Sequence, residues 1–241
     1  MIPAGFILAR VGEEGDPASF LELRRESERE GRGVRCDLAG VSLRGGRAEA
    51  RGMPIVKAVG EARTAADATA GLLCDAFLLA AAGIRVTAIE RSPVVFALAE
   101  DGLLRAQRDA RLAELIGDRI ELVHADARRW LEERIGTDHA PDAVVIDPMF
   151  PPKRKRSALP RKEMVVLREV VGSDLDAAEL LEVARKCARV RVALKRGDDA
   201  EELASPEWTV GGTTVRYDVW NTRAAPSENG AWYLRISRNL V

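Results

Sequence analysis

The residues best suited to chemistry are Asp147 and Pro148, which directly follow the apolar segment 143–146 and precede Met149 and Phe150. An exocyclic amine on a nucleobase is a poor nucleophile, because its lone pair is delocalised into the ring. A carboxylate and a carbonyl that accept hydrogen bonds from its N–H groups can orient the amine and stabilise its developing positive charge. Asp147 and the carbonyl of Pro148 are candidates for these acceptors, and Phe150 could stack on an extruded base. The motif favours modification of a planar amine, although an isolated Asp-Pro pair more often only closes a strand.

Polar or special residues also follow three other predicted strands. Gly71 permits a tight turn after the first, and Glu90 ends the second, 19 residues after Gly71. A carboxylate at this separation is typical of one that holds the ribose of an adenosine-containing cofactor. Asp126 follows a further strand, where it could face an adenine amine or cap the next helix. Because ligands of open α/β sheets bind beyond the carboxyl ends of the strands, we expect these residues to share one site.

The loop after the first strand indicates which cofactor this would be. A nicotinamide cofactor requires a glycine-rich loop that approaches its pyrophosphate, whereas this loop has only Gly71 before Leu72, Leu73 and Cys74. Asp75 at the start of the following helix would repel a pyrophosphate. S-adenosylmethionine has no phosphate and carries a cationic amino group and a sulfonium, so an acidic loop suits it better.

From residue 64 onward, strand and helix patterns alternate, which predicts an α/β fold with a mostly parallel sheet and helices on both faces. Ser92 and Pro93 have the types of an N-cap and a first helical residue. The predicted strands are 64–70, 86–89, 120–123, 144–146 and 190–194, and the predicted helices are 75–82, 93–104, 127–135 and 177–188.

The first 60 residues follow a different pattern. The charged segment 19–30 predicts a helix, 34–38 a strand, and the glycines at 40, 45 and 46 separate further short strands. We therefore expect a small, β-rich α+β appendage over residues 1–60 and a catalytic domain over residues 61–241.

Composition limits the other possibilities. The 241 residues include 37 basic and 38 acidic ones, so contact with a nucleic acid must depend on a local patch. Three widely spaced cysteines fit a reducing cytosol better than a disulfide framework, and with only two histidines we expect no metal. No run approaches the roughly 20 apolar residues of a membrane span, so the expected location is the cytoplasm.

A local basic patch follows the Asp-Pro motif. Six basic residues and no acidic one occur between positions 153 and 162. Such runs are usually solvated surface, but the position beside the proposed target pocket favours binding of RNA phosphates. Lys195 ends another strand and could face the same site. The candidate RNA-binding residues are Lys153, Arg154, Lys155, Arg156, Arg161, Lys162 and Lys195.

The chain resembles the RsmJ family of bacterial 16S ribosomal RNA guanine-N2 methyltransferases over about residues 34–220. The residues that carry the resemblance are Lys57-Ala58-Val59-Gly60, Asp67-Ala68-Thr69-Ala70-Gly71-Leu72, Asp75-Ala76-Phe77, Glu90-Arg91-Ser92-Pro93-Val94-Val95, Asp147-Pro148-Met149-Phe150-Pro151, Lys162-Glu163-Met164 and Lys195-Arg196.

This resemblance implies a class I methyltransferase fold, S-adenosylmethionine as cofactor, and methylation of a guanosine N2 near the 3′ end of 16S ribosomal RNA, with RNA or the small subunit as partner and a monomer favoured. It also implies cofactor contacts at Cys74, Asp75, Glu90, Arg91, Asp126, Ala127 and Asp147.

The chain departs from the family at Leu73 and Cys74, where the family usually has a glycine and an arginine. The added bulk is expected to narrow the pocket for the methionine part of the cofactor. Two alternatives therefore stay open, namely another planar amine such as adenine N6 or a protein amide, and an inactive protein that binds ribosomal RNA during assembly.

Overall fold

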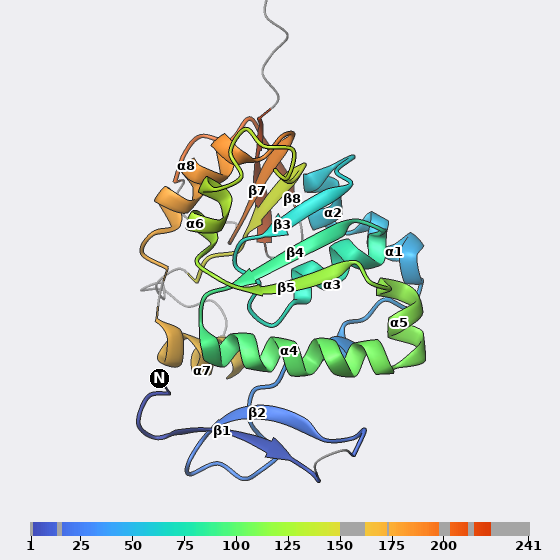
Figure 1. Cartoon of the computed structure of the whole chain (residues 1–241), viewed down its shortest axis with the longest axis vertical. Helices are drawn as coiled ribbons and strands as arrows, with labels where there is room; N and C mark the ends of the chain where they lie inside the picture. The colour runs from blue at the N-terminus through green and yellow to red at the C-terminus, as the bar shows by residue number, and fades with distance from the viewer. Residues whose placement is uncertain are drawn as a thin grey trace, which may run out of the picture.

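The computed structural model describes residues 2–13, 16–149, 162–172, 174–197, 203–211 and 215–222. A seven-stranded sheet in the order β5-β4-β3-β6-β7-β9-β8 forms its centre (Figure 1). The parallel strands are β3 (Thr64–Asp67), β4 (Arg85–Glu90), β5 (Ile120–His124), β6 (Ala143–Ile146) and β7 (Arg191–Gly197). Two antiparallel strands, β9 (Val215–Asn221) and β8 (Trp208–Gly211), extend the sheet beyond β7. The predicted α/β fold is confirmed, but the sequence did not indicate β8 and β9.

Helices cover both faces of the sheet (Figure 1). One buried cluster joins the sheet to α1 (Gly46–Gly52), α2 (Pro54–Val59), α3 (Cys74–Ala82), α4 (Pro93–Arg108) and α5 (Ala110–Ile116). The other joins the opposite face to α6 (Ala127–Glu132) and α8 (Ala177–Cys187). Adjacent strand residues divide between these clusters, as Ala65 and Ala66 do on β3, because successive side chains of a strand point to opposite faces.

The N-terminal region forms a hairpin that packs below α4 in Figure 1. Strand β1 (Phe6–Val11) pairs with β2 (Phe20–Arg25), and Leu23 and Val34 pack against α4 and α7 (Lys162–Val171). Asp101 of α4 fixes this position, since its Oδ2 accepts a hydrogen bond from the backbone of Leu21 at 3.1 Å and its Oδ1 one from Arg10 at 3.1 Å. The hairpin is thus attached to the helix that follows β4.

Three predictions for this region are wrong. The predicted helix 19–30 is replaced by β2, because pairing with β1 and contacts to α4 outweigh the helix propensity of its Glu and Arg residues. The predicted strand 34–38 makes only an isolated bridge, Leu23 to Val34, before the 3₁₀ turn η1 (Leu38–Gly40). The expected strands beyond residue 40 are instead α1 and α2, whose apolar residues cover the sheet.

The prediction at Ser92 is confirmed, because its Oγ accepts a hydrogen bond from the backbone of Val95 and α4 begins at Pro93. None of the helices in the described ranges is both long and apolar enough to cross a membrane.

Candidate active site

The site lies where the chain order of the sheet reverses. Strand β3 has β4 on one side and β6 on the other, so the loops that follow β3 and β6 diverge at their carboxyl ends. Such a point is where open α/β sheets bind ligands. A cavity of about 290 Å³ opens there, and six residues predicted as cofactor contacts line it: Gly71, Glu90, Arg91, Asp126, Ala127 and Asp147.

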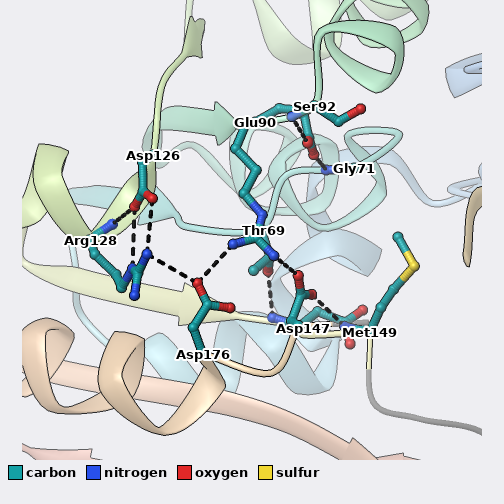
Figure 2. A network of polar contacts seen from close by, with 11 residues as sticks. Thr69, Gly71, Glu90, Ser92, Asp126, Arg128, Asp147, Met149 and Asp176 are labelled. Carbon is teal, nitrogen blue, oxygen red and sulfur yellow. Dashed lines mark hydrogen bonds and ion pairs between the residues drawn. The ribbon is translucent and has the colours of Figure 1, made fainter. Parts of the chain in front are cut away.

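Glu90 holds the loop after β3 to the loop after β4 (Figure 2). Its Oε2 accepts a hydrogen bond from the backbone of Gly71 at 3.0 Å, and its Oε1 accepts one from the backbone of Ser92 at 2.7 Å. Burial raises the pKa of Glu90, although both N–H groups favour the charged form. Gly71 has φ +51°, which a side chain would disfavour. The carboxylate is therefore fixed on the cavity wall, where its remaining lone pairs can accept hydrogen bonds from the hydroxyl groups of a ligand.

Leu73 does not narrow the pocket as expected. It adopts φ 63°, the left-handed region in which glycine is usual, and its side chain is 0% exposed within the cluster beneath the sheet. Burial of this side chain offsets the cost of its backbone conformation. Cys74 is exposed at the start of α3, and it does not line the cavity either.

Asp147 lies at the carboxyl end of β6 beside Thr69, whose Oγ1 accepts a hydrogen bond from the Asp147 backbone at 2.6 Å (Figure 2). Met149 is fixed in turn, because its backbone donates to Asp174 Oδ2 at 2.7 Å and its carbonyl accepts from the Asp174 backbone at 3.1 Å. Pro148 between them is buried. The motif loop is thus held at both ends with the Asp147 side chain 43% exposed toward the cavity.

Lys195 lies between two carboxylates at this site. Its Nζ is 2.8 Å from Asp147 Oδ2 and 3.0 Å from Asp75 Oδ2. Partial burial lowers the pKa of Lys195. The charges of Asp147 and Asp75 raise it by more, so the pKa lies above its ordinary value. Asp75 does not line the cavity, and this shared lysine connects it to the motif.

Residues that line the cavity also form a set of ion pairs that the sequence did not indicate. Arg91 pairs closely with Asp174 and, at 2.8 Å, with Asp176, and Arg128 reaches Asp176 at 3.4 Å. Asp126 caps α6, as its Oδ1 accepts from the backbone of Arg128 at 2.9 Å (Figure 2). Although partial burial raises it, the pKa of Asp126 is lowered overall by the hydrogen bonds from Arg128. The only signal for Asp174 and Asp176 was their position just before α8.

Several predicted residues lie outside the described part of the chain: Phe150, Lys153, Arg154, Lys155, Arg156 and Arg161. Lys162 is the first residue of α7, and its side chain is also outside what the structure describes. The proposed stacking surface and most of the basic run therefore stay predictions.

The residues that line the cavity fit S-adenosylmethionine. Ile89, Val95 and Leu180 provide apolar contacts for an adenine ring, and Glu90 provides acceptors for ribose hydroxyls. The buried carboxyl group of Asp67 lies at the end of β3, and its Oδ2 has no hydrogen-bond partner among the described residues. The cavity itself is lined by five carboxylate side chains and two arginines, and this acidic lining suits a ligand that carries positive charge.

Comparisons with known proteins agree with this fit. The model of the family described as "Putative SAM-dependent methyltransferase" matches residues 16–222. The ribosomal RNA small subunit methyltransferase J of Chromobacterium violaceum is 44% identical over 184 residues, which cover 73% of this chain and 70% of the relative. The protein of the same name from Enterobacter sp. (strain 638) is 42% identical over 219 residues, covering 86% of this chain and 83% of the relative.

A solved structure extends the similarity to the fold. The SAM-dependent methyltransferase NGO1261 from Neisseria gonorrhoeae superposes with a TM-score of 0.64 at 29% identity, over 88% of this chain and 83% of the other. The predicted cofactor, S-adenosylmethionine, and the predicted enzymatic activity, methyl transfer, are thereby confirmed. This chain belongs to the S-adenosylmethionine-dependent methyltransferase family of the ribosomal RNA small subunit methyltransferase J proteins.

Proposed function

We propose that this enzyme methylates the exocyclic N2 of a guanosine in 16S ribosomal RNA, near the 3′ end. The observation that carries the proposal is the position of Asp147 and Pro148, which follow β6 directly beside the cavity for the cofactor. The names of the curated relatives, which specify the small-subunit ribosomal RNA, support this choice of substrate.

Different residues around the cavity would contact different parts of the cofactor. Glu90 would accept the ribose hydroxyls, and the backbone at Asp126 and Ala127 would face the adenine ring. Arg91 would contribute through its ion pairs with Asp174 and Asp176, which also line the cavity. Bound S-adenosylmethionine supplies an electrophilic methyl group. Gly71, Cys74 and Asp75 belong to the adjoining loop and helix, where the acidic charge of Asp75 favours the cationic part of the ligand.

The chain would orient and activate the amine rather than form a covalent intermediate. Asp147 and the Pro148 carbonyl would accept hydrogen bonds from the two N–H groups of N2, so that the lone pair of N2 faces the methyl group. Formation of the N–C bond would accompany cleavage of the methyl–sulfur bond, and the excess N2 proton would leave to Asp147 or to water. Phe150 would stack on the base after its extrusion from the RNA.

The basic residues 153–156 and 161–162 would bind the RNA backbone next to this pocket. With ribosomal RNA as substrate, we place the enzyme in the cytoplasm and propose that it acts as a monomer.

Transfer of labelled methyl groups from S-adenosylmethionine to small-subunit RNA without its native modifications tests the proposal. We expect the label in N2-methylguanosine after digestion to nucleosides, on free RNA or on assembled subunits. Label in N6-methyladenosine or in ribosomal protein would replace the guanine assignment with another planar amine. Absence of cofactor binding in calorimetry would instead favour the inactive assembly protein.

Substitution of Asp147 tests the assigned chemistry. At saturating cofactor, Asp147→Ala is expected to lower the turnover rate by about 10²-fold or more, because N2 loses a charged acceptor. Asp138→Ala removes an exposed carboxylate on the connection between α6 and β6 and serves as the matched control. Near-normal turnover by Asp147→Ala would contradict the role of this residue.

A further inference from the structure

We propose that Lys195 selects guanine by donating a hydrogen bond to O6 of the target base, beside the carboxylate of Asp147. The inference rests on the proposed function and assigns the choice between guanine and adenine to one side chain.

The sheet places the two side chains next to each other. Parallel strands β6 and β7 pair Ile146 with Leu194, so Asp147, which directly follows β6, lies beside Lys195, which is still within β7. The Lys195 Nζ lies 2.8 Å from Asp147 Oδ2, and the Lys195 side chain is 22% exposed. A base that reaches Asp147 therefore meets the ammonium group at the same edge.

Lys195 also has the hydrogen-bonding capacity for this contact. An ammonium group has three N–H donors. Asp75 and Asp147 account for two contacts, and the same two carboxylates favour the protonated form. The neighbouring Arg196 cannot take this role, because it is 2% exposed and pairs with Asp218 of β9 at 3.0 Å.

An adjacent carboxylate and ammonium complement one purine but not the other. The Watson–Crick edge of guanine presents an acceptor at O6 and donors at N1 and N2. Asp147 can accept from the donors while Lys195 donates to O6. Adenine presents a donor at N6 and an acceptor at N1, which would place its amine against the ammonium. A site whose buried polar groups lose their partners discriminates strongly against the wrong ligand.

A purely structural role for Lys195 makes a different prediction. If the lysine only neutralised Asp75 and Asp147, its loss would impair every target base to the same extent. The test must therefore compare substrates that differ only at position 6 within one variant, because folding and cofactor affinity cancel in that ratio.

The substrates are RNAs that span the methylated nucleotide, assembled into subunits where free RNA is not accepted, with guanosine, 6-thioguanosine or 7-deazaguanosine at that position. Sulfur is a weak acceptor, whereas 7-deazaguanosine leaves the Watson–Crick edge intact. We expect the wild-type enzyme to prefer guanosine to 6-thioguanosine by about tenfold in kcat/KM, as for a hydrogen bond to a charged donor. Guanosine and 7-deazaguanosine should react alike.

In Lys195→Met the preference for guanosine over 6-thioguanosine should fall to near one, whereas Lys195→Arg should retain most of it. Lys57→Met, which removes an exposed lysine of α2, is the control for the loss of charge. If Lys195→Met turns over too slowly, the affinities for the guanosine and 6-thioguanosine RNAs are compared instead, in the presence of S-adenosylhomocysteine.

An unchanged preference in Lys195→Met, or no preference in the wild-type enzyme, would overturn the inference. Failure of the wild-type enzyme to methylate guanosine would instead refute the proposed function, so the two failures are distinguishable.

Discussion

The carboxyl group of Asp67 makes the stability of this enzyme depend on pH in an unusual direction. Burial raises its pKa to about 8, and its Oδ2 has no hydrogen-bond partner among the described residues. The folded chain therefore holds this proton to a higher pH than the unfolded chain does. It follows that the contribution of Asp67 to the free energy of unfolding is greatest below about pH 4 and falls by about 1.4 kcal/mol per pH unit up to about pH 8.

Replacement of this carboxyl group by an amide, which does not titrate, should remove the loss of stability that accompanies its ionisation as the pH rises. We expect Asp67→Asn to unfold at a higher urea concentration than the wild-type protein at pH 8, with the difference shrinking toward pH 5. Asp118→Asn, at an exposed position before β5, is the control. A stability difference that is the same at pH 5 and pH 8 would show that Asp67 does not titrate in this way.

The predictable part of the site consists of residues that follow a strand directly. Gly71, Glu90, Asp126 and Asp147 all follow predicted strands, and the structure brings them to one cavity. The partners of these residues were not predictable, because they depend on how distant segments approach. The hydrogen bond between Asp147 and Thr69, 78 residues apart in sequence, is an example.

Helix α4 carries a close contact that reverses the usual effect of a glycine substitution. Alanine in place of a glycine inside a helix normally adds about 1 kcal/mol of stability. A Cβ atom at Gly102 would lie 2.2 Å from the Cys36 Sγ and 2.9 Å from the Cys36 carbonyl oxygen. The segment before η1 would have to move away from α4.

We therefore expect Gly102→Ala to lower the free energy of unfolding by about 1–3 kcal/mol in urea titrations, as overpacking does. Gly52→Ala at the end of α1 is the matched control, because nothing lies within 4 Å of its Cβ position. It should leave stability unchanged or raise it. The same gain at both glycines would show that the contact with Cys36 relaxes without cost.

Elements with strong local signals were predicted well, whereas elements that depend on pairing were not. The N-cap at Ser92 and the apolar strands 120–123 and 144–146 carry their own signals. Strand β2 lies in a sequence that favours a helix and exists because β1 and α4 cover it. Strands β8 and β9 pair in antiparallel order without a helix between them, so the βα alternation gave no indication of them.

The integration of the N-terminal region bears on the predicted boundary near residue 60. The hairpin contacts α4 and α7 through the cluster that includes Leu23 and Val94. Residues 50–59 instead contribute Ala50, Ile55 and Val59 to the main cluster beneath the sheet. The two parts of the first 60 residues should therefore differ in their effect on folding.

Two truncations separate these contributions. Removal of residues 1–33 should leave a cooperatively folding protein with a lower melting temperature, because the sheet and its main cluster stay complete. Its affinity for S-adenosylmethionine should fall severalfold, since α7 loses support from the hairpin while Val170 and Val171 line the cavity. Removal of residues 1–60 also takes away α1 and α2, which uncovers part of one face of the sheet, and should abolish folding. Circular dichroism and calorimetry distinguish these outcomes.

A folded protein that lacks residues 1–60 and still binds the cofactor would establish those residues as a separate appendage. Full affinity without residues 1–33 would show that α7 does not depend on the hairpin.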